Sequence, residues 1–167
     1  TCFAAMRAAR EAGVTVSLDL NLRKLLWPTD RARAIIHAAL AFTDVALPGM
    51  DDARELSGLT DPLEIVRFYQ GFGPKIVALT LAEDGALVAE GDAVHEIAPR
   101  PARLVDASGA GDCFDGSFLA RLCAGDDVAK AARYATVAAS MSVEGVGAIA
   151  PVPYARDVEA ELARQAG

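Results

Sequence analysis

The chain has 167 residues, of which 53% are apolar and 23% are charged, so it is long enough for one globular domain or for part of a larger one. Its longest apolar run, 34–42, is interrupted by His37 and is much shorter than the roughly 20 residues that cross a bilayer, which excludes a transmembrane helix. The 16 Lys and Arg against 23 Asp and Glu give a net charge of −7, and without a basic patch we expect no binding to nucleic acid.

The N-terminal segment predicts the last turns of a helix. Phe3, Met6 and Arg10 are three to four residues apart, and Gly13 provides the position that ends a helix. No basic region is followed by an apolar stretch there, so we recognise no export signal and expect a cytoplasmic location. A chain that starts inside a structural element is expected to be a fragment of a longer protein.

Apolar strands alternate with amphipathic helices along the rest of the chain. Strands are predicted at 14–20, 44–47, 75–81 and 102–105. Helices are predicted after Pro28 with Thr29 or Asp30 as the cap, at 51–56 before Gly58, from Pro62 with Asp61 as the cap, from the turn 106–112 to Gly125, from Asp126 or Asp127 to about 143, and around Asp157. The segment 86–97, with Gly91-Asp92 at its centre, predicts an antiparallel hairpin at a sheet edge. This alternation indicates the α/β class with a mostly parallel sheet.

The segment 105–114 is the most informative one, because a strand there enters a turn of small residues that leads directly into a helix. The backbone amides of Gly109, Ala110 and Gly111 and the positive end of the helix are expected to face an anion, most commonly phosphate. Asp112 would lie beside that anion as an ionised carboxylate and could accept the proton of an attacking hydroxyl group. The alternative is that small residues only permit a tight turn and that Asp112 caps the helix.

Other chemistries fit the sequence less well. The P-loop pattern is absent because no Gly-Lys pair occurs, and the dinucleotide pattern GxGxxG fails because Phe114 occupies its third glycine position. The histidines lie far from Cys113, so we expect a packed cysteine there and not an activated thiolate. The three cysteines, Cys2, Cys113 and Cys123, contain no CxxC pair, so neither a zinc site nor a disulfide framework is expected.

The segment DASGAGDCFDGSFLARL at 106–122 resembles the C-terminal motif of the ribokinase (PfkB) family of carbohydrate kinases, D-T-x-G-A-G-D-x-F-x-x-G. Four more segments are similar to the family, so the resemblance covers nearly the whole chain: SLDLNLRKLLW, LPGMDDARELSG, LTLAEDGAL and SVEGVGAIAPVP. It implies a three-layer α/β/α domain of which residues 1–167 form the C-terminal part, without the N-terminal half and its β lid.

The resemblance also implies roles for single residues. Asp112 would be the catalytic base, and the amides of Gly109, Ala110 and Gly111 would form the anion hole for the transferred phosphoryl group. Asn21, Leu22 and Arg23 would lie where the sugar meets ATP, with Arg23 contacting a phosphate or a substrate carboxylate. Without the family, Arg23 is equally well a surface arginine that follows a strand.

The nucleotide is expected to contact a second group of residues: Gly49, Thr80, Ala82, Glu83, Gly85 and Thr136. Thr136 would approach the base, although the pattern alone favours packing inside an alanine-rich helix. Three residues depart from the family: Gly49 replaces a common Asn, Ala82 a common Gly and Ala107 the usual Thr. These departures predict an altered nucleotide preference or affinity.

Metal ions are expected with the nucleotide. By the resemblance, Asp52 would help to hold Mg²⁺ through water, and backbone carbonyls near Asp106 and Ser108 would form a monovalent-cation site, with K⁺ the candidate ion. A solvated aspartate at a helix start is the alternative for Asp52.

The sequence therefore predicts an ATP- and Mg²⁺-dependent kinase that phosphorylates a primary hydroxyl group of a small sugar or sugar acid. Among family members it looks most similar to 2-keto-3-deoxygluconate kinases, and fructokinases come next. A non-catalytic module that binds a nucleotide or phosphate is the alternative from another class. The sequence leaves a homo-oligomer open, and we expect apolar surface where the missing half would pack.

Overall fold

The computed structural model describes residues 1–165, which divide into two compact units. Unit 1 contains Thr1–Leu81 and Leu87–His95, and unit 2 contains Ala82–Ala86 and the chain from Glu96 onward. Along these residues α-helices alternate with strands, which confirms the predicted α/β class. None of the described helices is both long and apolar enough to span a bilayer.

The sheet begins with three parallel strands in unit 1. They are β1 (Ser17–Asp19), β2 (Val45–Leu47) and β3 (Ile76–Thr80), with Leu18 opposite Ala46 and Ala46 opposite Val77. Strands β4 (Ala86–Glu90) and β5 (Ala93–Ile97) follow in the order β1-β2-β3-β4-β5. The two-residue turn between β4 and β5 contains Gly91 at φ 55°, so the predicted hairpin forms at the edge of the sheet.

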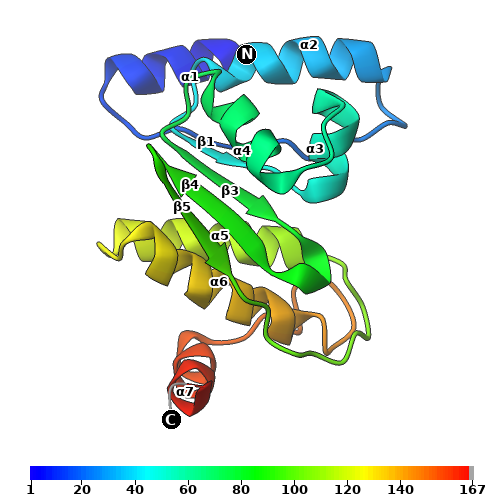
Figure 1. Ribbon diagram of the computed structural model, residues 1–167, viewed down its shortest axis with the longest axis vertical. Coiled ribbons are helices and arrows are strands. Elements are labelled where there is room, and N and C mark those ends of the chain that lie inside the picture. Colours follow the sequence, from blue (N-terminus) through cyan, green and yellow to red (C-terminus); the bar gives the residue numbers. More distant parts are fainter. Residues whose placement is uncertain (166–167) are drawn as a thin grey trace. The chain divides into compact units, whose positions relative to one another are not determined.

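Four helices belong to unit 1, and three of them pack against these strands and close its core (Figure 1). They are α1 (Cys2–Glu11), α2 (Thr29–Leu40), α3 (Met50–Ser57) and α4 (Pro62–Gln70). The core cluster joins strands to α2, α3 and α4, with Leu40, Leu56, Ile65, Tyr69, Val77 and Leu79 among its most buried members. Asp61 caps α4 as predicted, because its carboxylate accepts the Glu64 amide at 2.9 Å.

Unit 2 is built mainly from three helices. They are α5 (Ala110–Cys123), α6 (Val128–Ser142) and α7 (Ala155–Gln165), and α5 and α6 run side by side (Figure 1). Cys113, Val137 and Val158 pack together, one from each helix. Cys113 is therefore the packed cysteine that the sequence predicts, and burial raises the pKa of its thiol. The short 3₁₀ helix η1 (Ala82–Asp84) also belongs to this unit.

Two local predictions are wrong. Neither Thr29 nor Asp30 caps α2; its N-cap is Pro28 and no side chain caps this end. The predicted strand at 102–105 does not form, and Leu104 and Val105 are exposed. No described strand pairs with this segment, and the Val105 amide donates instead to the Val143 carbonyl at 2.8 Å.

Candidate active site

The glycine-rich turn of unit 2 presents several backbone amides without an internal partner. Gly109 is the N-cap of α5 and has a left-handed conformation, with φ 75°. The Ala110 amide, predicted to face an anion, donates instead to the Ala107 carbonyl at 3.2 Å. Among the described residues no acceptor is found for the amides of Gly109, Gly111 and Asp112. The start of α5 therefore has three backbone amides without an acceptor among the described residues. The sequence analysis did not predict the free amide of Asp112.

The two glycines of this turn are constrained differently. A Cβ on Gly109 would lie 2.8 Å from Ala148 Cβ and 2.9 Å from the Ala148 carbonyl oxygen, so close approach and left-handed backbone both require glycine. A Cβ on Gly111 would meet nothing within 4 Å, and its φ is not positive. The fold therefore does not need glycine at 111, and a ligand remains as a reason for it.

Asp112 lies in the first turn of α5 with an exposed side chain. It does not cap the helix, so the capping alternative is wrong. Within residues 1–165 its carboxylate forms no ion pair. It is therefore available to a ligand at the end of the helix where the free amides lie.

Asp106 organises the approach to this turn. Its carboxylate accepts the Ser108 amide at 2.9 Å and the Gly147 amide at 2.8 Å. These hydrogen bonds, first that from Ser108, hold the pKa of Asp106 below its usual value. The Asp106 side chain is thus engaged within the protein, which leaves the backbone carbonyls for the predicted monovalent cation.

A second group of predicted residues lies in unit 1, where the parallel strands end. Asn21, Leu22 and Arg23 follow β1, Gly49 follows β2, and Thr80 is the last residue of β3. Gly49 and Thr80 are joined by a parallel bridge. The carboxyl ends of parallel strands are the usual place for ligands in open α/β sheets, so the fold brings this group to a suitable edge.

Asp52 holds the loop after β1 in place. Its Oδ2 accepts the Leu22 amide at 2.7 Å, which connects α3 to the predicted binding loop. In that loop Asn21 has φ 37°, and its amide donates to Asp19 Oδ1 at 3.0 Å. Asp52 is therefore more than the solvated aspartate of the alternative interpretation.

A hollow of about 340 Å³ opens beside this loop, entirely within unit 1. It is lined by Asn21, Arg23, Leu26, Trp27 and Arg31. Neither arginine forms an ion pair with a described carboxylate, and the Arg23 guanidinium donates one hydrogen bond within residues 1–165, to Leu22 O at 3.4 Å. Sequence reasoning missed Leu26, Trp27 and Arg31; an arginine one turn into the following helix is the only signal that could have indicated the last.

Comparison with known proteins identifies the family. The family model described as "pfkB family carbohydrate kinase" matches residues 1–155, which is almost the whole chain. The chain belongs to the pfkB family of carbohydrate kinases. It is 37% identical over 145 residues to a 2-dehydro-3-deoxygalactonokinase of Haloferax volcanii, covering 84% of this chain and 45% of that protein. A 2-dehydro-3-deoxygluconokinase of Thermoproteus tenax is 30% identical over 145 residues, covering 86% of this chain and 45% of that protein.

Solved structures of pfkB kinases share the fold. Fructokinase from Vibrio cholerae O395, solved with fructose, ADP and calcium, has a TM-score of 0.88 and 27% identity over 95% of this chain and 54% of that one. The ribokinase-like fold predicted from the sequence is thereby confirmed. The chain spans about half the length of the relatives it matches.

The nucleotide residues predicted for unit 2 differ in their surroundings. Ala82, which replaces a common pfkB glycine, adopts φ 52°, and Gly85 has φ 92° with Ile97 O only 2.1 Å from a built Cβ. Glu83 lies between them on η1 and is exposed. Thr136 is buried on α6, and its Oγ1 has no hydrogen-bond partner among residues 1–165. This burial favours packing, and the contact of Thr136 with the base stays a prediction.

The acidic residues fit magnesium only as a companion of phosphate. No group of three or more His, Cys, Asp or Glu side chains gathers around a common point in the described part of the chain. Mg²⁺ in kinases is commonly held by one or two carboxylates together with substrate phosphates and water. The Leu22 amide donates to Asp52 Oδ2, so Asp52 Oδ1 is the oxygen that could contact such an ion through water.

Proposed function

We propose that the whole protein transfers the γ-phosphoryl group of ATP to a primary hydroxyl group of a 2-keto-3-deoxy sugar acid, with 2-keto-3-deoxygluconate as the first candidate. The observation that carries the proposal is the unpaired Asp112 carboxylate in the same helical turn as the free Gly111 amide. A site for binding alone has no use for a carboxylate beside an anion, because the two charges repel.

The chemistry follows from these groups. The amides of Gly109, Gly111 and Asp112 and the positive end of α5 stabilise negative charge that develops on the transferred phosphoryl group. The Asp112 carboxylate accepts the proton of the acceptor hydroxyl group as its oxygen attacks phosphorus. Mg²⁺, when bound with ATP, neutralises phosphate charge.

The hollow of unit 1 supports an acidic acceptor. Arg23 and Arg31 both line it and have no carboxylate partner among the described residues, so an anionic group would satisfy them. The wall formed by Leu26 and Trp27 suits the carbon chain of a deoxy sugar. Relatives named 2-dehydro-3-deoxygalactonokinase and 2-dehydro-3-deoxygluconokinase act on substrates of this class.

The test is ADP release by the full-length protein with Mg-ATP. The acceptors are 2-keto-3-deoxygluconate, its galactonate epimer, fructose, ribose and adenosine. Asp112→Asn should lower kcat by about 10²-fold or more, since it removes the base without changing side-chain size. Asp92→Asn is the matched control, because Asp92 is exposed in the β4–β5 turn.

Each result has a defined meaning. Preference for a keto-deoxy acid that is lost on Arg23→Met or Arg31→Met supports the acceptor class. Preference for fructose would retain the mechanism and replace the substrate with that of a fructokinase. ATP binding without turnover of any acceptor would favour the non-catalytic nucleotide-binding module, and full activity of Asp112→Asn would exclude Asp112 as the base.

A further inference from the structure

The segment 98–109 leads from β5 to the glycine-rich turn. Hydrogen bonds and ion pairs connect it to α6, to the residues that follow α6 and to α7. At its start the Ala98 carbonyl accepts Arg133 Nη1 of α6 at 2.7 Å. Near its end the amides of Val105 and Asp106 donate to the Val143 carbonyl at 2.8 and 3.2 Å. Because this segment belongs to no strand, these contacts replace the hydrogen bonds of a sheet and set its path.

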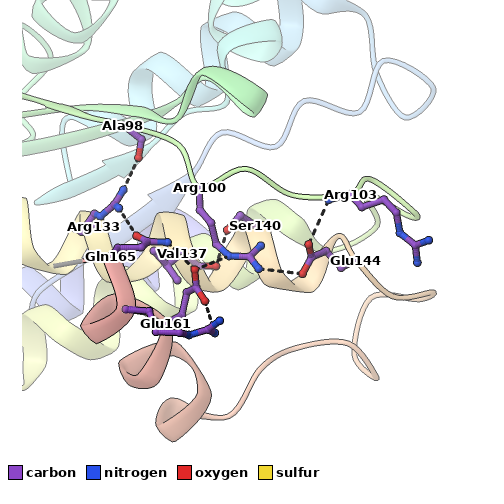
Figure 2. Close-up of polar contacts among 10 residues, drawn as sticks. Ala98, Arg100, Arg103, Arg133, Val137, Ser140, Glu144, Glu161 and Gln165 are labelled. Carbon is purple, nitrogen blue, oxygen red and sulfur yellow. Dashed lines mark hydrogen bonds and ion pairs between the residues drawn. The ribbon is translucent and has the colours of Figure 1, made fainter. Parts of the chain in front are cut away.

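Arg100 is the centre of this attachment (Figure 2). Its Nη2 lies 3.3 Å from Glu144 Oε2, just beyond the end of α6, and its Nε lies 3.2 Å from Glu161 Oε1 on α7 in an ion pair whose angle falls short of a hydrogen bond. The Arg100 side chain is 15% exposed and that of Glu161 is 11% exposed, so little solvent screens the pair. Removing one partner of an ion pair buried in this way strongly destabilises the protein, because the other charge stays buried without compensation.

Glu144 extends the attachment toward the turn. While its Oε2 pairs with Arg100, its Oε1 accepts the Arg103 amide at 3.2 Å. The hydrogen bond from Arg100 is the main reason that the pKa of Glu144 is lowered, which keeps this carboxylate charged. The neighbouring Gly147 amide binds Asp106, and Asp106 also holds Ser108. These contacts, together with the short backbone segment from Glu144 to Gly147, connect α7 to Ser108, the residue before Gly109.

We propose that Arg100 is a positioning residue for phosphoryl transfer: through Glu144 and Glu161 it couples α7 to the amides at the start of α5. This inference rests on the proposed function. It assigns a role to α7, which begins where the match to the pfkB family ends, at residue 155. The amides of the turn stabilise the transferred group, so a small displacement of segment 98–109 changes kcat more than the affinity for ATP.

The test compares variants of the full-length protein in steady-state kinetics and thermal unfolding. Arg100→Met should lower kcat about 10- to 100-fold, while KM for ATP stays within about threefold. Arg100→Lys should recover part of kcat, because one ammonium group keeps the charge but cannot reach both carboxylates as a guanidinium does. Arg164→Gln is the matched control: Arg164 pairs with the same Glu161 from an exposed position and should leave kcat unchanged.

Further variants keep the test decisive if Arg100→Met does not fold. Glu144→Gln and Glu161→Gln preserve size and one acceptor oxygen, and each should lower kcat in the same direction. The double variant Arg100→Lys/Glu144→Gln should be no slower than the slower single variant, because the two side chains act as one unit.

The outcomes separate this inference from the proposed function. Wild-type kcat in all folded variants, with only a lower Tm, would overturn the positioning role while an inactive Asp112→Asn would leave the kinase assignment intact. An increase in KM for ATP in these variants without a change in kcat would also overturn the positioning role. Full activity of Asp112→Asn would instead remove the function on which the inference rests.

Discussion

Gly111→Ala tests whether the turn before α5 holds a ligand. The structure predicts that the added methyl group is harmless to the fold, because nothing lies within 4 Å of a Cβ at this position. Gly111 is the second residue of α5, so alanine should stabilise the helix by about 0.5 kcal/mol. Gly111→Ala should therefore raise stability while it lowers activity.

The methyl group would intrude where the anion is expected. In a helix the Cα–Cβ bond is tilted toward the N-terminus, the side to which the free amides of Gly109 and Gly111 point. A phosphoryl group displaced by about 1 Å should lose about 10²-fold in kcat/KM.

Urea unfolding and ADP-release kinetics on the full-length protein measure the two effects of Gly111→Ala. Gly109→Ala is the comparison, because its Cβ would lie 2.8 Å from Ala148 Cβ, and it should lose stability as well as activity. If Gly111→Ala is stable and as active as the wild type, the turn does not contact the transferred group and the reasoning is refuted.

Three further predictions concern the surroundings of the candidate site. Ala82→Gly should raise the free energy of unfolding by about 0.5 kcal/mol, because relief of the left-handed backbone at φ 52° exceeds the added flexibility of the unfolded chain; Ala34→Gly in α2 should lower it by about 1 kcal/mol, and equal effects would contradict the argument. Gly85→Ala should prevent stable folding, since its Cβ would lie 2.1 Å from Ile97 O, and a cooperative unfolding transition at the wild-type Tm would disprove this. Burial lowers the pKa of His37 from 6.5, so its contribution to stability is complete above that pH and is lost as the pH falls below it; urea titrations should show a smaller loss of stability on acidification for His37→Phe than for wild type.

Much of the fold could be predicted because local signals agree with tertiary packing. Pro62 with Asp61 before it marked α4, and Asp127 marked α6, since each capping carboxylate is bound by an amide three residues later. The strand at 102–105 could not be judged locally. Its apolar residues are compatible with a strand, but strand formation depends on a neighbouring strand elsewhere in the chain.

The candidate site was predictable in composition and less so in detail. The residue types around Gly109 and Asp112 indicated free amides and a base, because that chemistry depends on local backbone. The engagement of the Ala110 amide by Ala107 depends on the exact turn conformation. Arg31 lines the hollow beside Arg23 because of the way the loop folds back toward α2. Residue spacing in the sequence does not predict that path.

The two hydrogen bonds of Asp106 have a consequence for ligand binding. They shape the turn 106–109 with groups of the protein itself, so its conformational entropy is lost during folding and not at the encounter with a phosphate. Binding to a preorganised turn requires no slow rearrangement, so association is limited by diffusion and orientation. Removing the Asp106 carboxylate would shift that entropic cost to the moment when the turn must hold the transferred phosphoryl group, so kcat would fall although none of the predicted anion-hole amides has changed.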